Sequence, residues 1–154
     1  MVTREEIQRK VKNALDELYR TDQFLFEKKL CERCINHKFA VYLEKQSFGE
    51  GYFVDCEYNK SHLNSETSPK YVSNPNGNYI DIIITKRNGV GQDDLVCFET
   101  KRWDKYKGRK KDRKNLKILT AGQKFAYKLG LYVIFGQSRD KVKIEVYEKG
   151  ILAV

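Results

Sequence analysis

The fold of this chain is decided by YIDIIITK at residues 79–86 and LVCFETKRW at residues 95–103. Both stretches are rich in the β-branched and aromatic residues that are typical of strands. The segment between them contains Asn88-Gly89, a dipeptide that favours tight hairpin turns. The pattern therefore predicts two antiparallel strands joined as a β-hairpin.

Three charged residues interrupt these apolar strands, and their spacing predicts a site. Glu99 and Lys101 are two positions apart, so they project from one face of their strand, and the hairpin partner can bring Asp81 onto that face. The opposite parity is apolar and consists of Ile80, Ile82, Val96 and Phe98. We therefore expect one face to be core and the other to carry a site. The alternative is an ordinary half-exposed sheet with a cross-strand ion pair.

The chemistry that such a set supports is hydrolysis of a phosphodiester. Two carboxylates bind a hard cation such as Mg²⁺ and leave positions for water and a phosphate oxygen. The cation neutralises the scissile phosphate and acidifies the attacking water. The ammonium of Lys101 can stabilise charge or orient that water.

The sequence before the hairpin predicts two helices and a strand. Thr3-x-x-Glu6 is a capping box, and apolar residues then repeat at helical spacing, which indicates a helix over about residues 3–20. A second helix is expected over about residues 28–46. GYFVDCEYN at residues 51–59 is typical of a strand.

The remaining segments predict a loop, a helix and two strands. Residues 61–78 are polar and contain both prolines, so they predict a long loop. A third helix should begin near Asp112 and stop at Gly130. Its apolar positions are Leu116, Leu119, Phe125, Ala126 and Leu129. LYVIFG at 131–136 predicts a strand buried on both faces, and VKIEVYE at 142–148 predicts an edge strand.

The predicted element order is α-α-β-β-β-α-β-β. A strand, a helix and a strand near its end imply a right-handed crossover, so we expect an α/β (α+β) fold with a mixed sheet. A length of 154 residues with 40% hydrophobic residues suits a single domain, residues 1–154, with one core. The start, MVTREEIQRK, lacks the apolar region of a signal peptide, and no run approaches ~18 apolar residues. We expect a soluble, cytoplasmic protein with no membrane partner.

Positive charge is concentrated in one segment. Residues 101–117 contain ten cations and two carboxylates, so they hold a net +8 of the chain's +9. Such a concentration points to a polyanionic partner, and the interleaved rings of Trp103 and Tyr106 suit bases and phosphates. We expect a basic loop over about 102–114, with Gly108 making it a flexible arm; a merely solvated loop is the alternative. The expected nucleic-acid contacts there are Arg102, Lys105, Lys107, Arg109, Lys110, Lys111, Arg113 and Lys114.

The four cysteines favour reduced thiols over a disulfide framework. Cys31-x-x-Cys34 followed by His37 has ligand-like spacing, but a closed zinc site needs four ligands. Cys56 and Cys97 each lie in an apolar, strand-like run, where cysteine acts as a small hydrophobic residue. We therefore expect structural thiols in a reducing compartment.

The charged residues of the hairpin also carry a family resemblance. Asp81, followed by Glu99-Thr100-Lys101 on the next strand, resembles the D…(E)XK signature of the PD-(D/E)XK nuclease superfamily. The predicted element order resembles its restriction-endonuclease-like αβββαβ core over about residues 28–136, with the first helix and the last strand as additions. Members include restriction endonucleases, archaeal Holliday-junction resolvases and the nuclease domains of recombination helicases.

The resemblance implies a role for each matching residue. It implies that Asp81 and Glu99 bind Mg²⁺, for which Mn²⁺ can substitute, and that the backbone carbonyl of Thr100 completes the metal shell. It also implies that Lys101 assists the attacking water. The chain departs from the family name at Ile80, which stands where the Pro would be.

Further matches lie outside the hairpin. Many members place a Glu on the helix before the first strand, and Glu32 is the candidate here; a solvated helix charge is the alternative. Gln123-Lys-Phe-Ala-Tyr127 resembles the QxxxY motif of recombination-helicase nucleases, in which helical spacing would put a catalytic Gln123 and a DNA-contacting Tyr127 over the active face. A packing tyrosine is the alternative. His37 is a further candidate for a phosphate contact.

The sequence thus predicts a Mg²⁺-dependent endonuclease acting on DNA. One alternative is a nucleic-acid-binding module that keeps the fold without catalysis. Another is an interaction protein whose basic segment binds an acidic partner or anionic lipid. A homodimer would let paired sites act on the two strands of a duplex.

Overall fold

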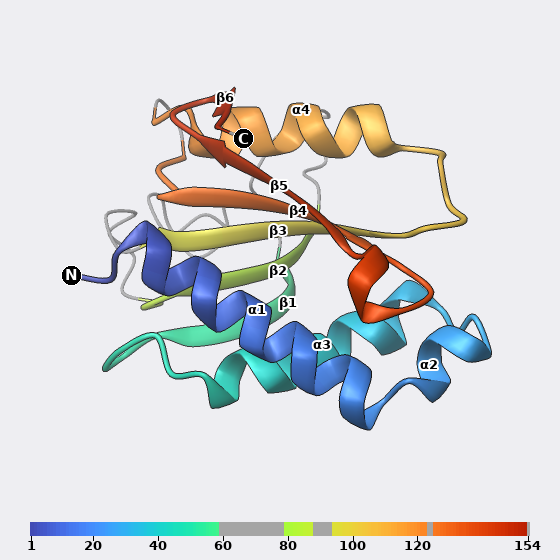
Figure 1. Ribbon diagram of the computed structural model, residues 1–154. Coiled ribbons are helices and arrows are strands. Elements are labelled where there is room, and N and C mark those ends of the chain that lie inside the picture. Colours follow the sequence, from blue (N-terminus) through green and yellow to red (C-terminus); the bar gives the residue numbers. More distant parts are fainter. Residues whose placement is uncertain (59–78, 88–93, 123–124, 154) are drawn as a thin grey trace.

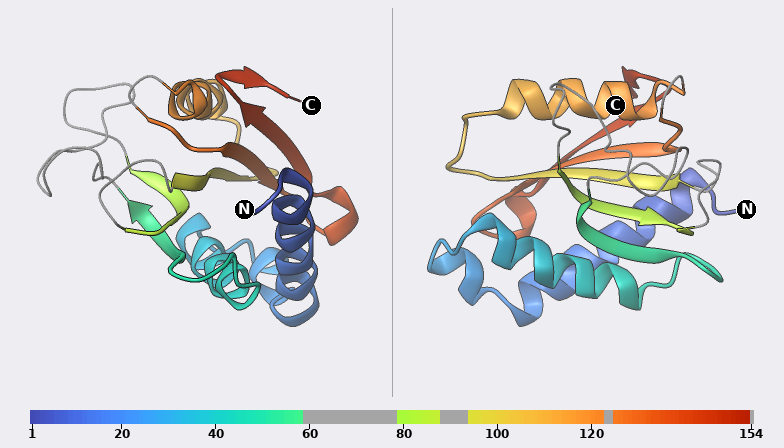
Figure 2. Two further views of the ribbon diagram at one scale, coloured as in Figure 1. Left: turned by 90° about the vertical axis from the view of Figure 1, so that its left-hand side faces the viewer. Right: turned by 180° about the vertical axis from the view of Figure 1, so that it is seen from behind.

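The computed structural model describes residues 1–58, 79–87, 94–122 and 125–153. Within these ranges a six-stranded sheet, with its strands in sequence order, lies between α4 on one face and α1 and α3 on the other (Figures 1 and 2). The helices are α1 (Arg4–Thr21), α2 (Phe24–Glu27), α3 (Glu32–Lys45) and α4 (Arg109–Thr120), and the strands are β1 (Phe53–Tyr58), β2 (Ile80–Thr85), β3 (Asp94–Arg102), β4 (Leu129–Phe135), β5 (Lys143–Glu148) and β6 (Ile151–Leu152). The prediction of a mixed α+β fold is confirmed.

The hairpin forms as predicted. β2 and β3 are antiparallel, with Ile82 opposite Phe98 and Ile83 opposite Cys97. The chain then crosses through α4 to β4, which runs parallel to β3, so the sheet is mixed. The turn at Asn88-Gly89 and the loop predicted at 61–78 lie outside the described residues.

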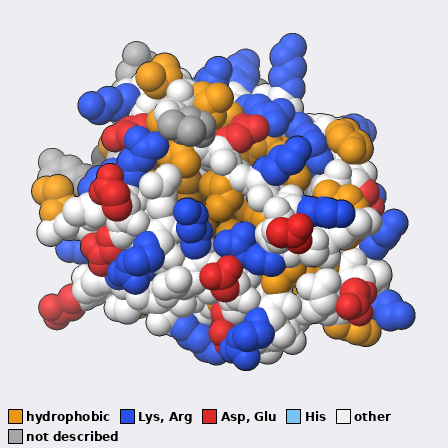
Figure 3. Space-filling model, in the orientation of Figure 1, with side chains coloured by type: hydrophobic (Ala, Val, Ile, Leu, Met, Phe, Trp, Pro, Cys, Tyr) orange, Lys and Arg blue, Asp and Glu red, His pale blue; other side chains and the backbone are white. Residues whose placement is uncertain are grey.

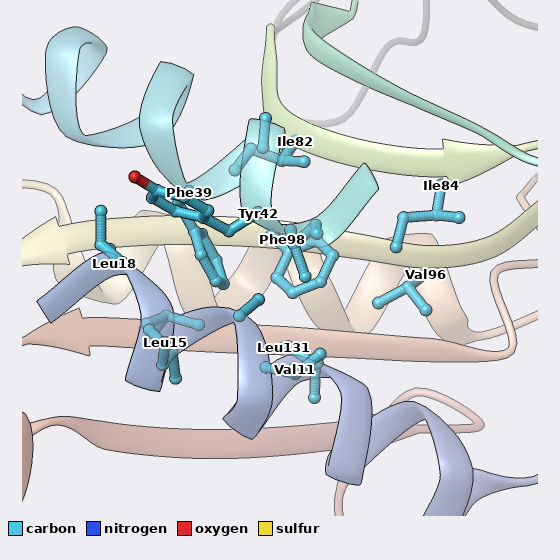
Figure 4. Close-up of a cluster of buried hydrophobic side chains, with 14 of the residues drawn as sticks. Val11, Leu15, Leu18, Phe39, Tyr42, Ile82, Ile84, Val96, Phe98 and Leu131 are labelled. Atoms are coloured by element: carbon cyan, nitrogen blue, oxygen red, sulfur yellow. The ribbon is translucent and has the colours of Figure 1, made fainter. Parts of the chain in front are cut away.

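The first helix also forms as predicted. The Thr3 hydroxyl accepts a hydrogen bond from the backbone N–H of Glu6 at 3.1 Å, and this cap fixes the start of α1. Its apolar stripe packs with α3 against the sheet, where aliphatic and aromatic side chains from both layers interdigitate (Figure 4). Two aromatic pairs in this core are edge-to-face, Phe39 with Phe98 and Phe39 with Phe135.

The start predicted for the second helix was wrong. α3 begins at Glu32, and the short helix α2 ends before it at Glu27. The break has a backbone cause, since Lys29 adopts φ 50°, in the left-handed region that ends a helix. The backbone N–H of Leu30 returns to the carbonyl of Leu25 at 2.9 Å, so the chain turns before α3 begins.

The end predicted for the third helix was also wrong. α4 spans Arg109–Thr120 and does not reach Gly130, which lies inside β4. A Cβ at Gly130 would lie 3.0 Å from Thr120 Cγ2 and 3.2 Å from Leu116 Cδ2. The glycine therefore lets α4 pack directly on the β4 backbone. A glycine at position 130 is therefore explained by the close contact of β4 with α4, and not by a helix cap.

The sheet is covered on both faces, which corrects the expectation that one face would be core and the other a site. The α4 face is itself apolar over most of its area, and its buried residues are Ile80, Ile83, Cys97, Leu116, Leu119, Phe125, Tyr127, Tyr132, Ile134 and Tyr147. Ile80 belongs to this second core and not to the first. A site on this face is therefore confined to one end of the sheet.

Two smaller expectations change as well. β5 is not an edge strand, because its residues Tyr147 and Glu148 pair with the short strand β6. Cys97 is buried, as expected, but Cys56 is exposed. Among the described residues, no helix is both long enough and apolar enough to cross a bilayer.

Candidate active site

A hollow of about 270 Å³ lies at the end of β3, between the first turn of α3 and the first half of α4. Its lining is polar and contains the three residues that the hairpin pattern predicted. The lining residues are Glu32, Tyr79, Asp81, Glu99, Thr100, Lys101, Lys111, Asp112 and Asn115. The predicted carboxylates and ammonium therefore lie together, at the end of the sheet where α4 does not cover it with apolar side chains.

Asp81 lies where β2 and β3 separate. The ladder between these strands runs as far as Ile82 and Phe98. Beyond that pair, the Asp81 carboxylate accepts hydrogen bonds from the Thr100 backbone N–H at 2.8 Å and the Thr100 hydroxyl at 3.2 Å. The Thr100 hydroxyl also lies 2.7 Å from Asn36 Oδ1 on α3, so its single proton is shared between this oxygen and the Asp81 carboxylate. The Asp81 carboxylate thus accepts the Thr100 N–H in place of a backbone carbonyl of β2, at the point where the pairing of β2 with β3 stops.

The same arrangement orients the Thr100 carbonyl. In an extended strand the N–H and C=O of one residue point to the same side. Since the N–H of Thr100 faces Asp81, its carbonyl lies along that edge of β3 as well. A backbone oxygen is therefore available beside the two carboxylates.

Glu99 is nearly inaccessible, with 5% of its surface exposed. Burial, and then the negative charges of Asp81 and Asp112, raise the pKa of Glu99 well above its ordinary value of 4.5. Burial also raises the pKa of Asp81, although the hydrogen bonds from Thr100 oppose the shift. Both shifts favour the protonated, neutral form of these carboxyl groups over the charged form.

Asn115 on α4 contacts this pair. Its Nδ2 donates to Glu99 Oε1 at 3.4 Å, and the residue is 3% exposed. Its Oδ1 is buried and has no hydrogen-bond partner among the described residues. A buried carbonyl oxygen without a partner costs about 1–3 kcal/mol, so it marks a place where a donor or a cation would be stabilising.

Lys101 is held from α4. Its Nζ lies 3.2 Å from Asp112 Oδ2, with the two side chains 16% and 14% exposed. Burial lowers the pKa of Lys101, but the charge of Asp112 and its hydrogen bond outweigh burial, so the pKa is raised and the amine is a cation. Asp112 also accepts a hydrogen bond from the Tyr132 hydroxyl at 3.3 Å. The ammonium is therefore fixed beside the carboxylates and not free in solvent.

Glu32 enters the hollow from the first turn of α3. Burial raises its pKa, the positive charge of Lys101 opposes the shift, and Asp81 and Asp112 add to it. The prediction that places Glu32 near the hairpin residues is consistent with this position. The hollow is thus lined by four carboxyl groups, those of Glu32, Asp81, Glu99 and Asp112, and by two lysines, Lys101 and Lys111.

The donor set fits a hard divalent cation. The described residues contain no cluster of three or more His, Cys, Asp or Glu side chains arranged to hold a metal ion. The predicted set instead uses two carboxylates, Asp81 and Glu99, with the Thr100 carbonyl, and Asn115 Oδ1 offers a further oxygen close by. Oxygen donors of this kind suit Mg²⁺ or Mn²⁺. Burial is the main cause of the raised carboxyl pKa values, and the neighbouring negative charges add to it for Glu99 and Glu32.

The basic segment is not a loop along its whole length, so the expectation of a loop over about 102–114 was wrong from Arg109 onward. Residues from Arg109 onward form α4, and Gly108 precedes the helix at φ 87°, where it serves as the N-cap residue. Two of the expected nucleic-acid contacts, Arg102 and Arg109, are instead hydrogen-bonded to other groups of the protein. Arg102 pairs with Asp104 and its guanidinium also donates to two backbone carbonyls before α3, and Arg109 donates to the carbonyls of Trp103 and Lys105.

A third expected contact, Arg113 on α4, is half-buried and is also paired. Arg113 forms a two-point contact with Glu145 at 2.9 and 2.7 Å and lies over the Tyr132 ring. The lysines differ, since Lys105, Lys107, Lys110, Lys111, Lys114 and Lys117 are exposed and form no ion pair with any residue in the described ranges. We call these six the α4 basic surface. Cationic side chains gather at the top of the molecule, where α4 lies (Figure 3).

The secondary motif is not assembled as predicted. Tyr127 does not lie on a helix; it is 2% exposed, belongs to the second core, and its backbone N–H donates to Leu119 O at 3.2 Å. It is a packing residue and not a DNA contact on α4. Gln123 lies outside the described residues. His37 is exposed on α3 and is not among the residues that line the hollow.

The sequence pattern missed three residues of the lining, Tyr79, Asp112 and Asn115, and it named Lys111 only as a nucleic-acid contact. Asp112 and Asn115 are three apart, so they share one helix face, and this spacing was the available signal. Both residues lie on the helix predicted from near Asp112, but the spacing does not specify which strand that helix face meets. No family model matches the chain, and no curated protein or solved structure shows significant similarity to it.

Proposed function

We propose that this protein is a metal-dependent phosphodiesterase that hydrolyses DNA, built on a restriction-endonuclease-like core. The observation that carries the proposal is the meeting of Asp81, Glu99 and Lys101 in one polar hollow. The order of elements from α3 to β4 agrees with the αβββαβ order that the resemblance implies. Two buried carboxyls with raised pKa are costly for stability, and a catalytic role for them explains why they are there.

Six residues of the hollow have a role in this proposal. Asp81, Glu99 and the Thr100 carbonyl hold Mg²⁺, which would supply the positive charge that stabilises the phosphate and acidifies water. Lys101, held by Asp112, donates hydrogen bonds to the reacting phosphate or to the attacking water. Glu32, with a raised pKa, accepts or returns a proton at the edge of the hollow.

The α4 basic surface supports DNA as the substrate. Lys111 belongs to both the lining of the hollow and that surface, so a polyanion bound along α4 reaches the carboxylates. Exposed lysines bind phosphates without regard to sequence, because each contact releases a counterion. The proposal therefore includes a DNA backbone running along α4 into the hollow.

The test is a digest of linear, nicked, single-stranded and four-way-junction DNA. Each substrate is incubated with Mg²⁺, with Mn²⁺ and with EDTA, and the Glu99→Gln protein is the matched control. We expect cleavage of at least one substrate with the metal ions and none with EDTA or the variant. Binding without cleavage on every substrate would support the non-catalytic nucleic-acid-binding module instead.

A further inference from the structure

Cys31 and Cys34 face each other at the start of α3. Their sulfur atoms are 3.2 Å apart, and both side chains are exposed. Cys31 is the N-cap residue of the helix, and the backbone N–H of Cys34 donates to the carbonyl of Cys31 at 3.0 Å. The first turn of a 14-residue helix therefore places two accessible thiols in contact.

The two thiols are not equivalent. The Cys34 thiol, and then the backbone N–H groups of the first turn, lower the pKa of the Cys31 thiol, whereas the pKa of the Cys34 thiol is raised. A thiolate at a helix N-terminus is stabilised by the unpaired N–H groups there. Cys31 is thus suited to attack a disulfide, and Cys34 is suited to attack the mixed disulfide that results.

The turn that holds this pair is joined to the candidate site. Glu32, which lines the hollow, lies between the two cysteines in the chain. Arg102 at the end of β3 donates to the carbonyls of Lys29 and Leu30 at 2.6 and 2.8 Å. A covalent change at the pair therefore acts on a segment held against the strand that carries Glu99 and Lys101.

We propose that Cys31 and Cys34 form a thiol–disulfide exchange site that takes small disulfides of the glutathione class and closes into a disulfide across the first turn of α3. In a reducing compartment the pair is a dithiol, and it closes when the pool of disulfides rises. This thiol chemistry does not rest on the proposed nuclease activity.

The reaction has two exchange steps. The Cys31 thiolate attacks one sulfur of the small disulfide, whose S–S bond breaks and releases one thiolate. Cys34 then loses its proton and attacks the Cys31 sulfur, which breaks the mixed disulfide and releases the second thiolate. The two released thiolates take up the protons that the cysteines lose. The protein is oxidised by two electrons, and the small disulfide is reduced to two thiols.

The experiment follows this closure by intact mass in the full chain. The chain carries Cys56→Ser, which removes the other exposed thiol among the described residues. It is incubated with oxidised glutathione, quenched with acid and alkylated, both in native buffer and in guanidinium chloride. Cys34→Ser and Cys31→Ser proteins in the same background are the matched variants, and circular dichroism checks their folding.

We expect the native protein to lose two thiols without retaining glutathione, and to close several-fold faster than in guanidinium. The Cys34→Ser protein should retain one glutathione on Cys31, and the Cys31→Ser protein should react several-fold more slowly. Retained glutathione on the native protein, disulfide-linked dimers, or equal closure rates in native buffer and guanidinium would each overturn the proposal. These readouts are independent of any DNA cleavage.

Discussion

Lys101 on β3 and Asp112 on α4 form an ion pair that crosses from the sheet to the helix covering it, with Nζ and Oδ2 3.2 Å apart. Both side chains are mostly buried, so the pair is screened little by solvent. It ties the predicted catalytic ammonium to a residue that the hairpin pattern could not identify. Asp112 thereby fixes where the positive charge of the hollow lies.

Asp112→Asn should lower turnover by roughly 10-fold, the scale seen when a residue that orients a site residue is removed. Lys101 would lose its charged partner, and its pKa would fall because Asp112 provides the largest contributions that oppose burial. DNA affinity should stay the same or rise, since a negative charge is lost. Single-turnover cleavage and filter binding measure the two effects. Asp16→Asn, which breaks a surface ion pair with Arg139, is the control and should leave both unchanged.

Lys101→Met should lower turnover far more than DNA affinity. The side chain keeps its length but loses the ammonium that acts on the reacting phosphate in the transition state. Lys111→Met is the matched control, because Lys111 lines the same hollow but is exposed. We expect the control to lose mainly affinity. If the two variants behave alike, Lys101 is one more phosphate contact.

Glu99→Gln should change the pH dependence of stability in metal-free protein. Because burial and the charge of Asp81 raise the pKa of Glu99, the folded state binds more protons than the unfolded state above pH 4.5. Stability of the wild type should therefore fall as pH rises through this window. The variant should fall less and be more stable at pH 7. Urea unfolding in EDTA at several pH values measures the difference, and parallel curves for the two proteins would contradict it.

Asn115→Leu should separate stability from cation binding. Replacing the amide by an apolar side chain of similar volume removes a buried oxygen that has no partner, which is stabilising, and also the long hydrogen bond to Glu99 Oε1, which is destabilising, so we expect only a small change in metal-free stability. Mg²⁺ binding, measured by calorimetry, should weaken. Asn13→Leu, an exposed asparagine on α1, is the control for the substitution itself. A variant with lower stability and unchanged Mg²⁺ affinity would assign Asn115 a packing role.

Neutralising Lys107, Lys110 and Lys114 to Gln should weaken binding to DNA of any sequence. The salt dependence of log Kd should become shallower by roughly one unit per lost phosphate contact. Cleavage at saturating DNA should survive, since these three do not line the hollow. The control replaces Arg9, Lys12 and Lys28, which are exposed on the α1 side of the sheet. Equal salt slopes in both triple variants would leave the α4 basic surface without a role in binding.

The parts of the fold that were predicted correctly rest on local patterns. Thr3 and Glu6 identify the start of α1, and the alternation around Glu99 and Lys101 identifies a strand face. Each of these patterns involves only residues that are close together in the sequence. Asp81 could be placed beside Glu99 and Lys101 because a hairpin pairs two strands that are consecutive in the sequence. These are short-range rules, so the chain itself contains the information.

The errors have a different origin. Phe125 and Leu129 continue the helical spacing of α4, yet Gly122 adopts φ 78° beyond the last turn, Phe125 packs in the second core and Leu129 begins β4. Asn115 reaches Glu99 only through the way α4 crosses β3, which no local spacing specifies. The error in the basic segment could have been avoided from the sequence. Lysine and arginine have high helix propensity, and Gly108 precedes them, so a helix that begins near Arg109 could have been predicted.

The placement of α1 and α3 before the strands they cover has a consequence for synthesis. Both helices are complete in the nascent chain before β2, β3 or β4 has been made, and their apolar side chains pack against residues of those later strands. Packing of α1 against α3 buries only part of their apolar faces. The growing chain therefore exposes an apolar surface until β4 emerges from the ribosome. Translation that pauses within residues 103–128 would prolong that state, and a ribosome-bound fragment ending there should be the form most prone to aggregate or to recruit a chaperone.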